Sequence, residues 1–121
     1  MTDDERYAQG IDIMKQLFGE VPKASEVHED LMEVATRNLF GDIWTRPHME
    51  IRERSMVTCA LLAALGRDQQ LKGHMKGALN VGISRETMKE LMLHVAHYAG
   101  FSSGVQGLSM AKEVFDELDG V

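Results

Sequence analysis

The stretch "GRDQQLKGHMKGALNVG", residues 66–82, decides the fold, because it shows helical periodicity between two breaks in the chain. Its residues at the helical intervals of three and four are Leu71, His74, Met75, Ala78 and Leu79. We predict a helix that has Asp68 as its N-cap and ends at Gly82. One side of this helix should be buried, and His74 lies on that side.

The pattern on either side of this stretch is also helical. The chain has 121 residues and only two prolines, Pro22 and Pro47, and no strand-like alternation persists. The predicted helices cover about 4–18, 25–40, 49–65, 68–81, 84–99 and 103–118. The length suits one domain, so we predict an all-α, single-domain bundle of about six helices over residues 1–121.

Apolar spacing within the other helices predicts which surfaces meet. The first two helices should bury Ile11, Met14 and Phe18, and Leu31, Val34 and Leu39, respectively. Gly41 should end the second helix and open a loop, "GDIWTRP". The run "MVTCALLAAL" is apolar nearly all round, so we expect the third helix to be central and buried. Small residues that allow close approach of the last helix are Ser103, Gly104, Gly107 and Ser109.

Charge and hydropathy exclude some functions. The net charge of −6 argues against nucleic acid as a partner. Residues 46–89 nevertheless carry 8 Lys or Arg against 4 Asp or Glu, a local excess that either binds a small anion or forms solvated helix faces. The apolar run "CALLAAL" is too short to span a bilayer, so we expect no membrane partner. The first residues do not resemble a secretory signal, and a cytoplasmic location is expected.

His74 has two interpretations, a packed core histidine or a reacting group. Burial favours the neutral imidazole, whereas a nearby substrate carboxylate favours the protonated one, so the ring suits a general acid or base. Lys72 and Lys76 lie on neighbouring faces, and Arg67 lies two turns earlier. From the residues alone, both interpretations stay open.

The other candidate groups are weaker. Arg52 and Arg54, in "IRERS", suit carboxylate binding or simple solvation. Glu90, His94 and His97 share one side of a helix, but their spacing is not that of a known zinc motif, so we predict no metal site.

The single cysteine, Cys59, excludes an intrachain disulfide and a CxxC pair. Its place in an apolar helix predicts a buried, unreactive thiol.

Four sequence elements occur together in order: "GDIW-R", "RxRS-VT", "LxxH-xxAL--G" and "H-A-YAG". Together they identify the stretch of about residues 30–118 as similar to the carboxymuconolactone decarboxylase family. The resemblance implies an all-α fold whose protomers assemble into trimeric or hexameric rings. It also implies one of two chemistries, a peroxidase or a decarboxylase.

The peroxidase branch resembles alkylhydroperoxidase D-like enzymes, which use a CxxC pair, a histidine four residues later and a glutamate on the preceding helix. His74 matches that histidine. The two cysteine positions fall on Arg67 and Gln70, and the glutamate position falls on about Ser55. Without a dithiol, no resolving thiol is available, so this branch is disfavoured.

The decarboxylase branch implies loss of CO₂ from a carboxylated lactone, such as 4-carboxymuconolactone, in the breakdown of aromatic compounds, without a cofactor. We expect His74 to act as the general acid and arginines to hold carboxylates. The expected substrate-binding residues are Arg52, Arg54, Arg67, Trp44 and His94. The alternatives are a peroxidase that uses Cys59 alone and a non-catalytic oligomer that binds a small hydrophobic acid.

Overall fold

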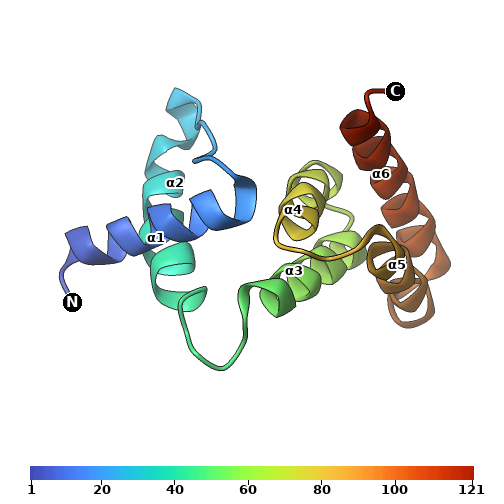
Figure 1. The fold of residues 1–121 in the computed structure, drawn as a ribbon, viewed down its shortest axis with the longest axis horizontal. Helices are drawn as coiled ribbons and strands as arrows, with labels where there is room; N and C mark the ends of the chain where they lie inside the picture. Colours follow the sequence, from blue (N-terminus) through green and yellow to red (C-terminus); the bar gives the residue numbers. More distant parts are fainter. The chain divides into compact units, whose positions relative to one another are not determined.

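A computed structural model describes all residues from 1 to 121 and is helical, without strands. Its elements are α1 (Asp3–Phe18), the 3₁₀ turn η1 (Glu26–His28), α2 (Glu29–Val34), the π-helix η2 (Ala35–Ile43), α3 (Ile51–Leu65), α4 (Asp68–Asn80), α5 (Arg85–Ala99) and α6 (Phe101–Asp119) (Figure 1). The predicted all-α fold with six α-helices is confirmed. None of the helices combines the length and apolar composition that a bilayer-spanning segment needs.

The chain forms two compact units, residues 1–51 (unit 1) and 52–121 (unit 2). In unit 1, α1 begins with a capping box in which the Thr2 hydroxyl accepts from the backbone N–H of Glu5. It packs against η2 through glycines. A β-carbon on Gly10 would collide with the carbonyl of Thr36, and one on Gly41 would collide with the carbonyl of Arg6. Only glycine therefore permits this separation of the two backbones.

The second predicted helix differs from the expectation both in where it ends and in which side chains it buries. Gly41 does not end it, because the helix continues to Ile43, and the amide of Trp44 bonds to the carbonyl of Leu39 five residues back. The residues predicted to be buried, Leu31, Val34 and Leu39, are exposed, whereas Thr36, Phe40, Gly41 and Trp44 are buried.

Unit 2 has its own hydrophobic core, rich in methionine. Its buried residues are Cys59, Ala63, Leu71, Met75, Ala78, Ile83, Met88, Met92, Val95, Met110, Ala111 and Val114. The methionines therefore fill space between helices, as flexible thioether side chains do well. The prediction that the third helix is central and buried is wrong for one side of α3, where Leu61 and Leu65 are 57% and 65% exposed. An apolar sequence alone did not show which of its faces meets water.

The ends of α4 and α5 largely follow the predicted signals. Ser84 caps α5, since its hydroxyl accepts from the amide of Thr87 at 3.0 Å. Gly82 has a φ of +103°, which glycine adopts without strain, and it turns the chain after α4. Asp68 is not the N-cap of α4, because the helix already includes it and Arg67 occupies the cap position.

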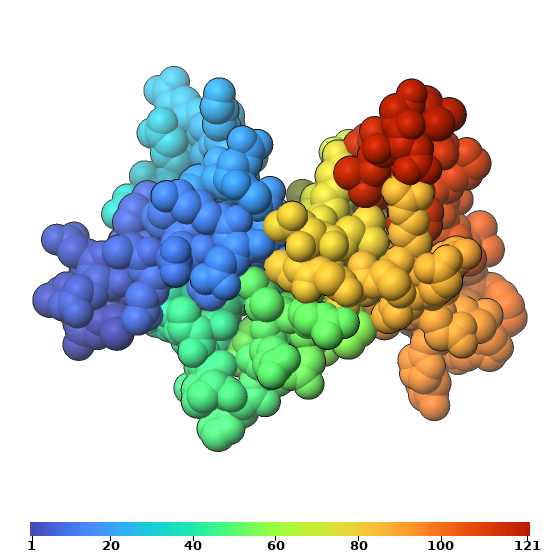
Figure 2. Space-filling view, in the orientation of Figure 1, coloured from blue at the N-terminus to red at the C-terminus, as the bar shows by residue number.

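Helices α5 and α6 lie side by side, as neighbouring brown and red ribbons in Figure 1 and adjoining orange to red surfaces in Figure 2. Their contact confirms the predicted close approach at small residues. A β-carbon on Gly104 would collide with Ala96, and one on Gly107 would collide with the thioether of Met92. The backbones are therefore closer than alanine would permit.

We predict that Gly104→Ala lowers the free energy of unfolding by about 1–3 kcal/mol, because the added methyl group has no space against Ala96. Gly73→Ala is the matched control. A β-carbon on Gly73, inside α4, meets nothing within 4 Å, so this change should raise stability by about 0.5–1 kcal/mol. Denaturant unfolding of both variants measures the difference. Equal effects would contradict the close packing.

Candidate functional site

His74 lies in the middle of α4, beside the residues that anchor this helix in the core. Leu71, Met75 and Ala78 are fully buried on one side of α4, and His74 at the edge of that side is half-buried. Its Nδ1 atom is shielded from solvent. The sequence therefore predicted correctly that the ring faces inward, and the structure places it at the border of the core.

Burial sets the protonation of His74. Desolvation lowers the pKa of its imidazole below the ordinary value, so the ring is neutral at pH 7. A neutral ring donates a proton to carbon poorly. An anion bound nearby would raise the pKa of His74 again and favour the protonated imidazolium. In that form the ring is a competent acid. The arrangement suits a group that acquires its proton together with an anionic ligand.

Arg52 is the arginine that the structure places at the C-terminal end of α4. Its guanidinium Nη2 donates to the carbonyl of Gly82 at 3.4 Å, and the side chain is otherwise exposed. Arg52 also shares a face of α3 with Ser55 and Cys59, at helical spacings of three and four. It is thus a surface cation above a buried face.

The other two predicted arginines do not accompany Arg52. Arg54 is two residues further along α3, so it points to the opposite side of that helix. Arg67 precedes the first residue of α4, whereas Arg52 lies beyond its last turn. The 13 residues of α4 span roughly 20 Å at 1.5 Å per residue. One small acid cannot be held at both ends of this helix.

The two lysines beside His74 are paired within unit 2. Lys72 lies 3.2 Å from Glu117 and 3.4 Å from Glu113, and Lys76 also pairs with Glu117. These lysines hold the pKa of the Glu117 carboxyl below its ordinary value. The lysines on either side of His74 are thus bound to α6. Of the two interpretations of the basic segment, this supports solvated and paired helix faces for the lysines.

His94 and His97 lie on the exposed side of α5. The ring of His94 stacks on Tyr98 with 4.7 Å between centroids, and Nδ1 of His97 donates to the carbonyl of Leu93 at 2.9 Å. These rings line a shallow hollow of about 520 Å³ formed by α5 alone, together with Glu90. No group of three or more metal-ligating side chains converges there or elsewhere in the chain.

Trp44 belongs to unit 1, where it is buried. Its ring packs on Phe40 with centroids 5.6 Å apart. A packing role within unit 1 accounts for this tryptophan, and its predicted role in substrate binding stays a prediction.

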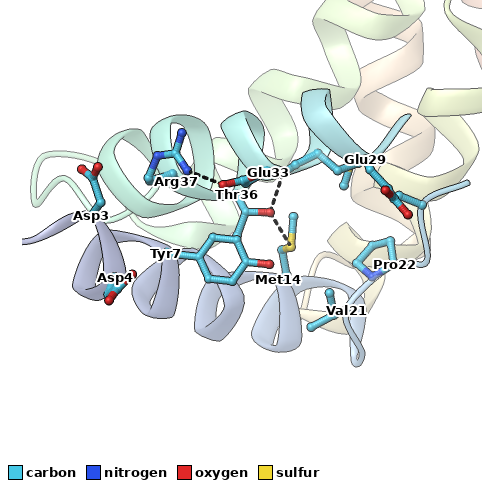
Figure 3. Close-up of a pocket in the computed structure, with 12 residues that line it drawn as sticks. Asp3, Asp4, Tyr7, Met14, Val21, Pro22, Glu29, Glu33, Thr36 and Arg37 are labelled. Carbon is cyan, nitrogen blue, oxygen red and sulfur yellow. Dashed lines mark hydrogen bonds and ion pairs between the residues drawn. The ribbon is translucent and has the colours of Figure 1, made fainter. Parts of the chain in front are cut away.

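A cavity of about 670 Å³ also lies in unit 1, between α1 and the α2–η2 segment (Figure 3). Its apolar floor includes Met14, and its rim is acidic, with Asp3, Asp4, Glu29 and Glu33. Arg37 lines it too, but its guanidinium is paired with Glu33 at 3.1 Å. An anionic substrate would be repelled by this rim, so the cavity does not fit the expected ligand.

Cys59 and Ser55 are the buried polar groups on the inner face of α3. Both residues are completely buried. The predicted burial of Cys59 is thus confirmed, and burial raises the pKa of its thiol to about 12, which disfavours the reactive thiolate. The hydroxyl of Ser55 is buried without a hydrogen-bond partner. We did not predict Ser55 as a site residue, although its position three residues after Arg52 on the same helix face was visible in the sequence.

The fold and these residues define a class: a small all-helical protein with a half-buried histidine and a fully buried single cysteine. The model of the carboxymuconolactone decarboxylase family matches residues 29–113, and the chain belongs to this family. The match runs from the start of α2 into α6.

Two curated relatives align along nearly the whole chain. A 4-carboxymuconolactone decarboxylase of Acinetobacter baylyi is 34% identical over 124 residues, which covers 98% of this chain and 92% of the relative. A nitrosuccinic acid decarboxylase of Metarhizium robertsii is 24% identical over 127 residues, which covers 97% of this chain and 89% of the relative. Both relatives are named as decarboxylases.

The lowered pKa of His74 predicts a pH dependence of stability. The folded protein binds the proton of this ring less readily than the unfolded chain, so unfolding takes up a proton on acidification. The contribution should be complete above the ordinary pKa of about 6.5, decline as the pH falls through that value, and level off below the lowered folded pKa. His74→Gln should remove this component from melting curves recorded between pH 5 and 8. His48→Gln, at an exposed turn, should leave it as in the wild type.

Proposed function

We propose that this protein is a carboxy-lyase that removes CO₂ from a small anionic acid, with 4-carboxymuconolactone as the first substrate to test. The single observation that carries the proposal is the 34% identity to the Acinetobacter baylyi enzyme along 98% of this chain. Membership of the family and the second named decarboxylase support the same class of reaction.

The names of the two relatives point to one chemical requirement. A carboxylated lactone and nitrosuccinic acid both place a leaving carboxylate where the electron pair of the broken bond can pass into a conjugated oxygen. The product then needs a proton on carbon. An enzyme for either acid therefore needs a proton donor and a cation that holds the anion. Neither the proton donor nor the cation has to be a thiol.

We assign the proton donor to His74 and the cation to Arg52. Burial keeps His74 neutral until an anion arrives, and its half-buried position allows contact with a ligand. Arg52 is exposed at one end of α4 and shares a helix face with buried Ser55. Arg67 and His94 rank below Arg52, because Arg67 lies at the other end of α4 and His94 stacks on Tyr98.

The alternative of a peroxidase that uses Cys59 alone has little chemical support. A thiol with a pKa of about 12 is protonated at neutral pH, and the thiolate is the form that attacks a peroxide. A non-catalytic acid-binding protein remains the second alternative. It differs from the proposal in one measurable respect, which is that the acid is retained rather than consumed.

The test is an assay of the purified protein with 4-carboxymuconolactone and with nitrosuccinate, following substrate loss and CO₂ release. We expect turnover of at least one acid. His74→Gln should lower kcat by about 100- to 10,000-fold, the usual contribution of a general acid. Arg52→Gln should chiefly raise KM, since it removes a charge that holds the anion.

Arg67→Gln is the control for Arg52→Gln, because it removes the same charge from the other end of α4. Its KM should stay closer to that of the wild type. If the wild type and His74→Gln are equally inactive on both acids, the proposed decarboxylase activity is refuted. A melting temperature that rises with an acid that is not consumed would instead favour the binding protein.

We also propose that copies of this chain associate into a ring, a trimer or a hexamer. The support is apolar surface on unit 2. Exposed apolar residues follow one side of α3 and of α6 at helical spacing: Val57, Leu61, Leu65, Phe101, Val105 and Leu108. Monomeric proteins rarely expose continuous apolar stripes of this kind.

Light scattering of the wild type at micromolar concentration should give the mass of a trimer or hexamer. Leu61→Glu should shift that mass towards the monomer, because it places a charge in the apolar stripe of α3. Gln69→Glu adds the same charge at an exposed polar position and should leave the mass unchanged. A stable monomer in the wild type would exclude the ring.

A further inference from the structure

We propose that the hydroxyl of Ser55 donates a hydrogen bond to an anionic oxygen of the acid bound beside Arg52. Ser55 is thus a substrate-contacting residue of the decarboxylase proposed above, and the inference rests on that function.

The hydroxyl of Ser55 is costly where it lies. The residue is 0% exposed, and its Oγ atom has no hydrogen-bond partner. A buried polar group that has lost water without gaining a partner destabilises the fold, and native proteins rarely contain one. Such a group is typical of sites where a ligand supplies the missing partner.

Other hydroxyls within the helices avoid this cost. Three of them bond to the carbonyl four residues earlier: Thr36 to Met32 at 2.6 Å, Thr58 to Arg54 at 2.7 Å and Ser109 to Val105 at 3.1 Å. Ser55 makes no such bond, although it is as buried as any of them. Its hydroxyl is therefore available to a group outside its own helix.

Its place on α3 identifies that group. Arg52 precedes Ser55 by three residues and Cys59 follows it by four, so the three share one face of the helix. Arg52 is exposed and Cys59 is sealed in the core. Along this face, Ser55 is the first buried polar group beneath the exposed guanidinium. A carboxylate held by Arg52 would have the Ser55 hydroxyl one turn below it.

The chemistry requires only that the hydroxyl keep its proton. In the decarboxylation, the C–C bond to the carboxylate breaks, CO₂ leaves, and the electron pair passes into the conjugated oxygen. The imidazolium of His74 then gives its proton to carbon. Ser55 donates a hydrogen bond to the anion throughout, and a neutral donor to a charged oxygen is among the stronger hydrogen bonds in proteins.

The test compares Ser55→Ala with Ser55→Thr and with the control Thr58→Val, whose hydroxyl is bonded within α3. Ser55→Ala should lower kcat/KM by about 10- to 100-fold, the effect of a lost hydrogen bond to a charged group. Its melting temperature without ligand should equal or exceed that of the wild type, because an unsatisfied group has been removed. Thr58→Val should retain wild-type kcat/KM, and Ser55→Thr should restore at least part of what Ser55→Ala loses.

A second measurement uses succinate, a dicarboxylate that resists decarboxylation, as the ligand. The rise in melting temperature that succinate causes should be smaller in Ser55→Ala than in the wild type and unchanged in Thr58→Val. If the wild type is inactive but succinate stabilises Ser55→Ala less than the wild type and Thr58→Val, the decarboxylase function is refuted and the contact between Ser55 and a bound acid is supported. Wild-type kcat/KM in Ser55→Ala, or a lower melting temperature with an undiminished succinate effect, would refute the contact.

Discussion

Close approach of helices at small residues is the constraint on which both units depend. In unit 1, Gly10 and Gly41 bring α1 and η2 together backbone to backbone, and in unit 2 Gly104 does the same for α5 and α6. The close contact of α1 and η2 also brings Arg6 to Asp42, and Arg6 donates to both carboxylate oxygens at 2.6–3.2 Å. Larger side chains fill the remaining space between the helices. The methionines of unit 2 do this well, because their flexible side chains adapt to gaps of irregular shape.

The sequence predicted the helices and their ends better than it predicted which helix faces are buried. Ser84 and Gly100 marked the ends of α5 correctly, because caps are local chemistry that one residue decides. The second helix was predicted less well: Leu31 and Val34 are exposed on the short helix α2, and Gly41 lies inside the π-helix η2 and does not end it. The prediction for Leu61 failed for another reason. Hydropathy does not show whether an apolar side chain is buried within the protomer or exposed on its surface.

The candidate site shows the same division. His74 was found by spacing, which places a residue on a helix face but does not say what else lies there. The three arginines seemed equivalent as charges, and only the structure shows that α4 separates Arg52 from Arg67. Ser55 was overlooked because a serine in a helix is ordinary in sequence. Its distinction is the lack of a partner, which is a property of three dimensions.

The π-helix has a consequence for how sequences of this kind can change in length. A π turn holds more residues than an α turn, so η2 carries surplus chain that a deletion between residues 35 and 43 would remove. The rewound helix would turn everything after it by about 100° per residue lost. A deletion before Phe40 would move Gly41 away from the carbonyl of Arg6, and one between Gly41 and Trp44 would move Trp44 away from Phe40. Insertions and deletions should therefore be tolerated in the turn at 45–50 and selected against here.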